Sequence, residues 1–321
     1  MEFEIILRII IIAAVVILVA GGVVAMLIIT RPIALMVYED QLVKTSPDKW
    51  QRECSAPENE EQAAMWEEGI EWAAGNVSCM TEVKIENDGL KLYGEFYNFG
   101  SDKCVIILPG RCECLKYSYY FALPYQKMGI NVLVIDARAH GLSDGKYSTI
   151  GVKESGDLRK WIEMLEDKFG IKEVWFHGIC IGTASAVLLM ASDDCPDCVK
   201  GLVTEGCFAS FRDTFKRHMK DLNRPWFPVL DMVMLNIKKY AHADVYKAAP
   251  IRHIDRIDQR VLFLFGEKDK FSVPKNSRKL YAKCKSSDKK LVWFSEGAHS
   301  HLRINNKEKY DNAIIDFVQN G

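Results

Sequence analysis

The residues best suited to chemistry form a pentapeptide in which a cysteine stands between two glycines, Gly178 to Gly182. The apolar run before it, 173–177, is typical of a short buried strand, and the run after it, 183–190, is typical of an apolar helix. A strand-to-helix turn this sharp favours glycine at its flanking positions. It would also expose Cys180 at a helix N-terminus, where a thiolate is stabilised. This context favours Cys180 as a nucleophile over the alternative, a chance pentapeptide in a glycine-containing loop.

A cysteine nucleophile needs a base, and the base needs an acid that orients it. Asp269 follows the β-branched and aromatic run 260–265, and His299 follows a second such run, 290–294. Both side chains would therefore lie beyond the carboxyl ends of strands, where open α/β sheets build their active sites. The order Cys, Asp, His along the chain is also the order that this architecture uses. We predict that Cys180, Asp269 and His299 form a catalytic triad.

Other titratable residues compete for the same roles. His301 lies two residues after the predicted base, and His140 lies in a turn after an earlier strand. Glu205 follows the predicted strand 201–204 and is the rival for the acid. Chain order and strand-end placement favour Asp269 and His299 over these rivals.

The negative oxygen of an acyl intermediate needs two backbone N–H donors. The first is expected from Ile181, the residue after the nucleophile. The second is expected after the apolar run 104–108, where Gly110 allows the backbone to approach a substrate and Arg111 supplies the N–H. An ordinary Pro-Gly turn that ends a strand is the alternative for this segment.

The elements that must position these residues alternate along the chain. The dipeptide Asp88-Gly89 predicts a hairpin between residues 81–85 and 90–98. Beyond it we expect a mostly parallel, doubly wound α/β sheet with an antiparallel start. Residues 208–246 interrupt the alternation and are interpreted as a helical lid over the nucleophile, although simple helix packing on the core would use the same residues. The expected strands are 104–108, 132–136, 173–177, 201–204, 260–265 and 290–294; the expected helices are 117–128, 152–169, 183–190 and 310–318.

Several segments together resemble the α/β-hydrolase superfamily, and most closely its membrane-anchored bacterial branch related to serine aminopeptidases and monoglyceride lipases. The resemblance covers roughly residues 80–320 and is much more specific than any one motif. Two features depart from that branch: Pro109 stands where a His-Gly pair is common, and cysteine replaces the usual serine. The segments are LPG at 108–110, IDARAHGLSDG at 135–145, GICIG at 178–182, FGEKDKFSVP at 265–274 and GAHS at 297–300.

The resemblance implies the α/β-hydrolase fold with a helical lid. Residue by residue, it implies Cys180 as the nucleophile, Asp269 as the acid and His299 as the base. It also implies Arg111 and Ile181 as the oxyanion donors. Cysteine at this turn is also found in relatives that resemble dienelactone hydrolases and polyhydroxyalkanoate synthases, which leaves the reaction class open.

The N-terminus has a different character. Ile9 to Ile29 is an uninterrupted run of apolar residues and glycines, and at 1.5 Å per residue it spans about 30 Å, the hydrocarbon thickness of a bilayer. A cleaved signal peptide normally has a much shorter apolar region. We expect a single-pass membrane anchor at 1–31, an acidic connector at 32–78 and the catalytic domain at 79–321. A chain that begins near Asp40 is accordingly expected to be soluble.

The side of the membrane on which the catalytic domain lies stays open. Arg31, Lys44 and Lys49 follow the apolar run while Arg8 precedes it, which favours a cytoplasmic domain. The ten cysteines favour the same side if they remain reduced. Similar anchored hydrolases often face outward.

The composition and charge of the chain limit the kinds of binding partner and cofactor that we expect. The 321 residues carry a formal net charge of −1, so nothing indicates nucleic acid as a partner. No phosphate-binding glycine loop or zinc-ligand spacing occurs, and we expect no cofactor and no metal. Cys195 and Cys198 are spaced as a disulfide or redox pair, with a structural role favoured. Cys112 and Cys114 border the predicted oxyanion loop.

Three functions are compatible with these residues. The leading hypothesis is a hydrolase of small acyl compounds (an ester, thioester or small amide) that forms an acyl-cysteine intermediate. The first alternative is an acyltransferase in which a second alcohol, amine or thiol takes the acyl group. The second alternative is an inactive, membrane-anchored binding protein that has kept the fold.

Overall fold

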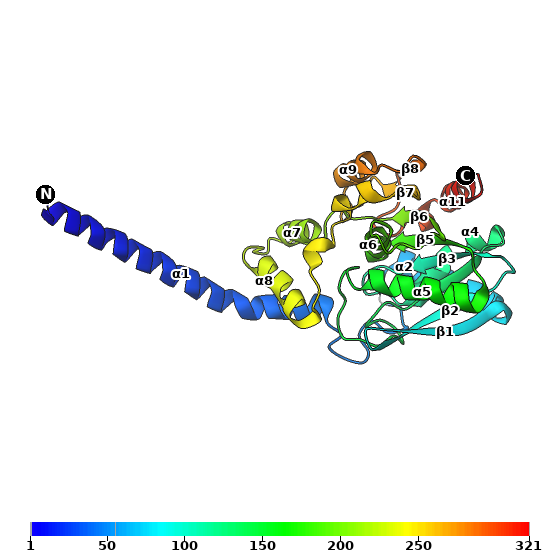
Figure 1. The fold of residues 1–321 in the computed structure, drawn as a ribbon, viewed down its shortest axis with the longest axis horizontal. Coiled ribbons are helices and arrows are strands. Elements are labelled where there is room, and N and C mark those ends of the chain that lie inside the picture. The colour runs from blue at the N-terminus through cyan, green and yellow to red at the C-terminus, as the bar shows by residue number, and fades with distance from the viewer. Residues whose placement is uncertain (1, 55, 321) are drawn as a thin grey trace.

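The computed structural model describes residues 2–54 and 56–320, and its centre is an eight-stranded sheet (Figure 1). The strand order is β1-β2-β4-β3-β5-β6-β7-β8, with antiparallel pairing of β1 with β2 and of β2 with β4, and parallel pairing elsewhere. This is the predicted mostly parallel sheet with an antiparallel start. The strands are β1 (Met80–Asn87), β2 (Leu90–Tyr97), β3 (Lys103–Leu108), β4 (Asn131–Ile135), β5 (Glu173–Ile179), β6 (Val199–Glu205), β7 (Arg260–Gly266) and β8 (Lys289–Phe294).

Helices cover both faces of the sheet, because the central strands are buried on both sides. One core lies between the sheet and the helices α5 (Glu154–Phe169), α6 (Ile181–Met190) and α9 (Pro274–Lys283). The other lies between the sheet and α2 (Glu60–Gly75), α3 (Leu115–Ser118), α4 (Leu123–Lys127) and α11 (Lys307–Gln319). The short helix α10 (Leu302–Asn305) leads into α11.

One predicted helix is wrong in its continuity. The expected helix at 117–128 consists of α3, a 3₁₀ turn at Tyr119–Phe121, and α4. Pro124 lies in the first turn of α4. Proline disfavours helical backbone at the residue before it and has no N–H to donate, so the segment divides here.

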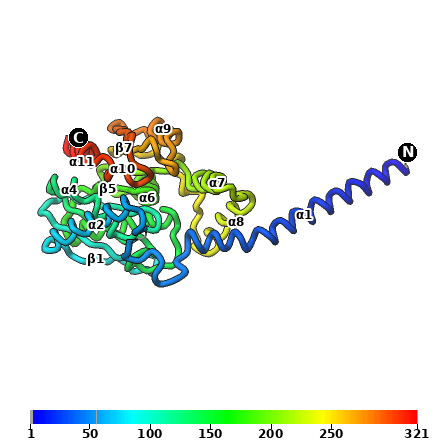
Figure 2. Tube along the Cα trace, turned by 180° about the vertical axis from the view of Figure 1, so that it is seen from behind, coloured from blue at the N-terminus to red at the C-terminus, as the bar shows by residue number. Residues whose placement is uncertain are grey.

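The segment between β6 and β7 contains α7 (Phe211–Asp221) and α8 (Val229–Asn236), and it lies where the lid was expected. A third core unites these two helices with the end of the N-terminal helix α1 (Glu2–Leu42). Figures 1 and 2 both show α8 alongside α1, with the N-terminal part of α1 extending away from the rest of the molecule.

The helix α1 does not end at the expected anchor boundary near residue 31. It continues through Pro32, and its last three turns place Ala34, Tyr38 and Leu42 in the core that they share with the lid. These residues are four apart, so they form one stripe along the helix. A chain starting near Asp40 would lack Ala34 and Tyr38 and therefore part of this third core, and its solubility stays a prediction.

The connector after α1 also packs on the domain. Arg52 pairs with the buried carboxylates of Asp136, at 2.9 Å, and Glu95, at 3.2 Å. In α2, Gly69 lies so close to the backbone of Tyr120 that a Cβ would come within 3.0 Å of its nitrogen. Residues 43–54 and 56–75 thereby hold the end of α1 close to the sheet.

Tyr38 provides a test of the α1–lid contact. Its ring stacks on Tyr147 and Tyr240, and its buried hydroxyl has no hydrogen-bond partner within the described residues, 2–54 and 56–320. We expect Tyr38→Ala to lower the free energy of unfolding by about 3 kcal/mol, as for other buried aromatic truncations. Tyr38→Phe removes an unsatisfied polar group and should leave stability unchanged or higher. Thermal unfolding of the full chain in detergent measures both, and equal losses for the two variants would contradict this packing.

Candidate active site

The turn at Cys180 is held by close contacts of the two flanking glycines. Cys180 joins β5 directly to α6 with backbone angles φ 50° and ψ −103°, a conformation that is strained for a residue with a side chain. A Cβ on Gly178 would lie 2.5 Å from the Cα of Thr183. A Cβ on Gly182 would lie 2.4 Å from the carbonyl oxygen of Leu108. The turn can therefore form only with glycine at both positions, as the pentapeptide predicted.

Asp269 and His299 lie together beyond the carboxyl ends of β7 and β8. The Nδ1–H of His299 donates to Oδ2 of Asp269 at 2.8 Å. The other oxygen of Asp269 accepts the backbone N–H groups of Phe271 and Ser272, each at 2.7 Å. Burial would raise the pKa of Asp269, but these hydrogen bonds hold it below its usual value. Asp269 is thus an ionised carboxylate that fixes the ring of His299.

His299 faces Cys180 on its other side. Burial lowers the pKa of His299, but the charge of the Cys180 thiolate and the hydrogen bonds with Cys180 and Asp269 raise it well above the usual value. Gly206 lies against the ring of His299. A Cβ at this position would come within 2.8 Å of Cε1 of His299, so glycine leaves room for the ring. The ring of His299, whose protonated form is favoured, therefore faces the sulfur of Cys180, an arrangement that supports the reaction of a cysteine nucleophile.

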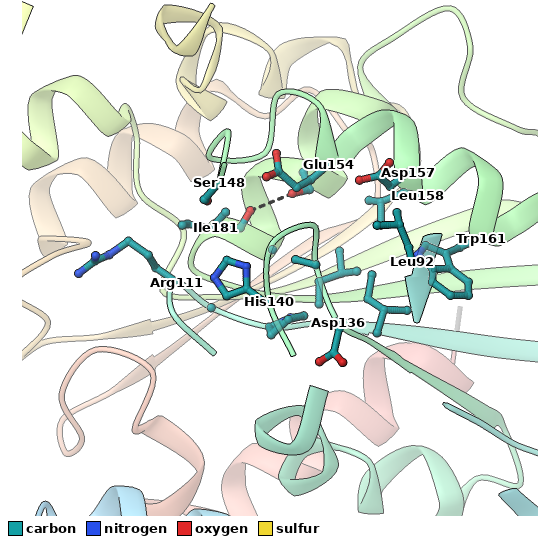
Figure 3. Close-up of a pocket in the computed structure, with 17 residues that line it drawn as sticks. Leu92, Arg111, Asp136, His140, Ser148, Glu154, Asp157, Leu158, Trp161 and Ile181 are labelled. Carbon is teal, nitrogen blue, oxygen red and sulfur yellow. Dashed lines mark hydrogen bonds between the residues drawn. The ribbon is translucent and has the colours of Figure 1, made fainter. Parts of the chain in front are cut away.

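The rival bases lie elsewhere. His301 Nε2 interacts with Oε1 of Gln62 in α2, at 2.7 Å. His140 stacks on Trp50 and lines a separate small cavity of about 30 Å³ behind the oxyanion loop (Figure 3). Burial lowers the pKa of His140 to about 4, so its ring is neutral. Neither histidine occupies the position between Cys180 and Asp269.

The rival acid, Glu205, is fully buried at the end of β6 and has different partners. It accepts the backbone N–H of Leu302 at 3.1 Å and the hydroxyl of Tyr310. Tyr310 contacts His177 in turn, with 3.0 Å between its hydroxyl and Nε2. Burial raises the pKa of Glu205 to about 7 against the effect of these hydrogen bonds. Glu205 therefore lies close to the His299 loop without orienting its ring.

The two predicted oxyanion donors lie on either side of the cleft. Ile181 is the first residue of α6, so its N–H belongs to the helix end that has no partner within the helix. In the opposite loop, the N–H of Gly110 donates to the carboxylate of Glu113 at 2.7 Å. The next N–H, of Arg111, is then the loop's candidate donor. Cys112 follows with a positive φ of 67°, which turns the chain sharply at this point.

Cys180 and His299 open into a cleft of about 260 Å³. Its walls are mainly apolar and aromatic, a composition that suits an acyl group. Most of the aromatic side chains come from the lid, and the end of α1 contributes two residues. The lining residues are Gln41, Leu42, Arg111, Cys180, Ile181, Phe208, Phe211, Thr214, Phe215, His218, Phe271 and His299.

Sequence reasoning missed three residues at this site. Gln41 and Leu42 line the cleft, and Gln41 Oε1 accepts a hydrogen bond from the guanidinium of Arg111 at 2.9 Å. The four-residue spacing of Ala34, Tyr38 and Leu42 could have shown that this end of α1 is buried. Glu113 was also missed, and no local motif indicates that its carboxylate turns back to Gly110.

Neither a metal nor a disulfide is part of the described site. Within residues 2–54 and 56–320, no group of three potential ligands could hold a metal ion. All ten cysteines are free thiols, including Cys195 and Cys198, for which a pairing had been considered. Burial raises the pKa of most of these thiols, for example that of Cys195 to about 11.

Comparison with known proteins agrees with this fold. A family model for the alpha/beta hydrolase fold matches residues 103–238. The chain is 28% identical over 208 residues to the uncharacterized protein YqkD of Bacillus subtilis, a match that covers 64% of this chain and 66% of that protein. It is also 28% identical over 241 residues to the uncharacterized membrane protein YNL320W of Saccharomyces cerevisiae, covering 73% of this chain and 77% of that protein.

Among solved structures, the esterase Pf2001 of Pyrococcus furiosus superposes with a TM-score of 0.61 at 22% identity, covering 75% of this chain and 91% of the esterase. The esterase EaEST of Exiguobacterium antarcticum gives a TM-score of 0.57 at 16% identity, with 74% and 100% covered. The predicted α/β-hydrolase fold and the resemblance to that superfamily are confirmed. These findings support an enzyme of the hydrolase type, while the triad stays a prediction.

The contact between Cys180 and His299 predicts how the thiol reacts. We expect iodoacetamide to alkylate Cys180 at a rate that changes little between pH 6 and 8, because the raised pKa of His299 keeps its ring protonated next to the sulfur. His299→Ala should lower the rate at pH 7 by about tenfold and make it rise with pH. Peptide mass spectrometry measures the rate, with Cys79 as an internal control thiol remote from the cleft. A pH profile unchanged by His299→Ala would contradict the pairing.

Glu205 predicts a pH dependence of stability. Its pKa is raised in the folded protein, so the folded state binds more protons and the free energy of unfolding falls as pH rises from about 4.5 to about 7. Glu205→Gln keeps the shape without the charge. We expect this variant to be more stable than the parent at pH 8, with the difference shrinking towards pH 5. Thermal unfolding at both pH values measures it, and a difference that grows on acidification would show the opposite linkage.

Proposed function

We propose that this protein, which has the α/β-hydrolase fold, is an enzyme that hydrolyses acyl compounds (an ester, thioester or small amide) through an acyl-cysteine on Cys180. The observation that carries the proposal is the arrangement of His299 between Cys180 and the buried carboxylate of Asp269. A nucleophile, an oriented base and an acid in this relation are what acyl transfer requires.

The reaction has two halves. The thiolate of Cys180 attacks the carbonyl carbon, and the backbone N–H groups of Ile181 and Arg111 stabilise the negative oxygen. The imidazolium of His299 then gives its proton to the leaving group, which leaves a thioester on the cysteine. In the second half, His299 takes a proton from water as the water attacks the thioester. Release of the carboxylic acid restores the thiolate and the imidazolium.

Asp269 supports both halves without exchanging a proton itself. Its hydrogen bond fixes the tautomer and direction of the His299 ring, and its charge stabilises the imidazolium. The aromatic walls of the cleft, among them Phe211 and Phe215 of α7, supply an apolar surface for the acyl chain.

Anchoring in a bilayer is the second part of the proposal. The helix α1 is long and apolar enough to cross a membrane: its most apolar window has a mean hydropathy of 3.1 and is not buried at all. We assign Ile9 to Ile29 to the hydrocarbon, with 1–31 as the anchor, 32–78 as the connector and 79–321 as the catalytic domain that carries the lid at 208–246. The similarity to a yeast membrane protein supports this assignment.

Removal of the thiol tests the reaction. We expect Cys180→Ala to lower the hydrolysis of a short-chain aryl ester by about a thousandfold or more, because no covalent intermediate can form. Cys180→Ser should retain partial activity, since serine depends more on its general base. Release of the aryl alcohol measures both rates, and an unfolding temperature equal to that of the parent is the control.

The intact mass of the protein tests the intermediate. Brief incubation with the ester should add one acyl group to the parent and none to Cys180→Ala. Hydrolysis that persists near the parental rate in Cys180→Ala would end the cysteine mechanism. Added alcohols or amines that divert the product from the acid would show acyl transfer in place of hydrolysis.

A further inference from the structure

The lid lies beside the part of α1 that enters the proposed membrane span. The hydroxyl of Thr30 contacts the sulfur of Met232 in α8 at 3.4 Å. Thr30 directly follows Ile29, the last residue assigned to the hydrocarbon, so Met232 lies at the level where that span ends. The loop that enters α8, residues 222–228, lies further along α1: its Leu222 and Arg224 border a pocket together with Val37, Asp40 and Gln41. At 1.5 Å per residue, Val37 is about 10 Å beyond Thr30, so the loop lies just outside the proposed hydrocarbon span.

This loop and the end of α7 form an exposed surface of unusual composition, which we call the lid rim. Leu222 and Phe227 expose 47% and 58% of their surface, although both are large and apolar. Trp226 lies between them and is half-buried, with Lys216 over its ring at 3.6 Å. The rim consists of Lys216, Lys220, Leu222, Arg224, Trp226 and Phe227.

The charge of the lid has the opposite sign to that of the chain as a whole. Residues 208–246 include seven lysines and arginines and four aspartates and glutamates, whereas the whole chain has a net charge of −1. Lys220 and Arg224 are exposed, and within the described part of the chain neither forms an ion pair. Lys220 lies over the ring of Trp226 at 5.7 Å, a contact that leaves its charge without a neutralising carboxylate. An outside anion could therefore pair with either cation.

Tryptophan, exposed aliphatic and aromatic side chains, and lysine or arginine are the combination that lies in the headgroup region of a bilayer. Basic residues near the surface are attracted to anionic lipids. We propose that the lid rim docks on an anionic bilayer surface beside α1, a proposal that rests on the anchoring part of the proposed function.

Docking would place the active site close to the lipid. Phe211, Phe215 and His218 of α7 line the catalytic cleft, and the last turn of the same helix carries Lys220. The opposite wall includes Gln41 and Leu42 of α1. The cleft thus lies between two elements that both reach the membrane, so acyl groups held in lipid are the substrate class that this arrangement favours.

Fluorescence quenching in nanodiscs tests the docking with the full chain. Lipids that carry bromine on the upper part of their acyl chains quench nearby tryptophans. None of the seven tryptophans lies in α1, and Trp226 is the one in the lid, so the difference between the parent and Trp226→Phe isolates its contribution. We expect that contribution in discs with anionic lipid and a much smaller one in zwitterionic discs.

Paired variants separate charge from apolar contact. Lys220→Glu with Arg224→Glu should reduce the Trp226 contribution in anionic discs to the zwitterionic level, whereas Lys279→Glu on the exposed face of α9 should not. Leu222→Ser with Phe227→Ser should abolish the contribution. Val77→Ser, which alters an equally exposed side chain (63%) far from the lid, should leave it intact. If the glutamate pair misfolds, Lys220→Gln with Arg224→Gln is the substitute.

The result distinguishes docking from catalysis. Quenching of Trp226 by the brominated lipids should persist in Cys180→Ala. The rim variants should still hydrolyse a water-soluble ester while losing hydrolysis of a long-chain ester in the disc. No Trp226 contribution in anionic discs, or an unchanged one in the charge-reversed pair, overturns the docking proposal. A parent that docks but hydrolyses neither ester would instead refute the proposed function.

Discussion

The backbone turn at Cys180 is the constraint on which the rest of the site depends. A side chain at φ 50° is unfavourable in itself, so the surrounding structure must hold it there. The turn is held because β5 is a central strand, paired on both sides. In addition, Gly178 and Gly182 pack so closely against Thr183 and Leu108 that neither position has room for a Cβ. The strain is therefore balanced by the packing of the sheet against α6, and the thiol projects into the cleft.

Electrostatics then determines what the thiol can do. Taking a charged group out of water is costly unless an opposite charge or several hydrogen bonds replace the solvent. At this site each charged group is stabilised by its neighbour. The backbone N–H groups of Phe271 and Ser272 donate to the carboxylate of Asp269. Asp269 in turn accepts from the ring of His299, which faces Cys180. Because each partner stabilises the charge of the next, loss of one member would change the protonation of the others.

Much of this arrangement could be predicted from the sequence, because local signals carry it. The glycines around Cys180, the strand-like runs before Asp269 and His299, and the hairpin at Asp88-Gly89 depend on residues close together in the chain. The division of the expected helix at 117–128 was missed, although Pro124 was a local signal for it. The contact of Gln41 with Arg111 joins residues 70 positions apart, and no periodicity encodes such a pair. Sequence periodicity indicates which face of α1 is buried, but it does not indicate against what.

The packing of α1 changes the role that an anchor can have. A flexible tether would not couple the shape of the cleft to the position of the anchor. Here, however, the last turns of α1 share a core with α7 and α8, and Gln41 contacts the loop that carries Arg111. Any tilt of α1 must therefore be transmitted to the lid or be absorbed by bending near Pro32, where the helix lacks a backbone donor. In the first case, with α1 anchored in a bilayer as proposed, the width of the cleft depends on how the helix is tilted there. In the second case Pro32 isolates the site from the membrane. The buried stripe of Ala34, Tyr38 and Leu42 begins immediately after this proline, and Thr30 before it contacts Met232 of α8. Both sides of Pro32 therefore pack on the lid, which favours transmission of a tilt to the lid over bending at the proline.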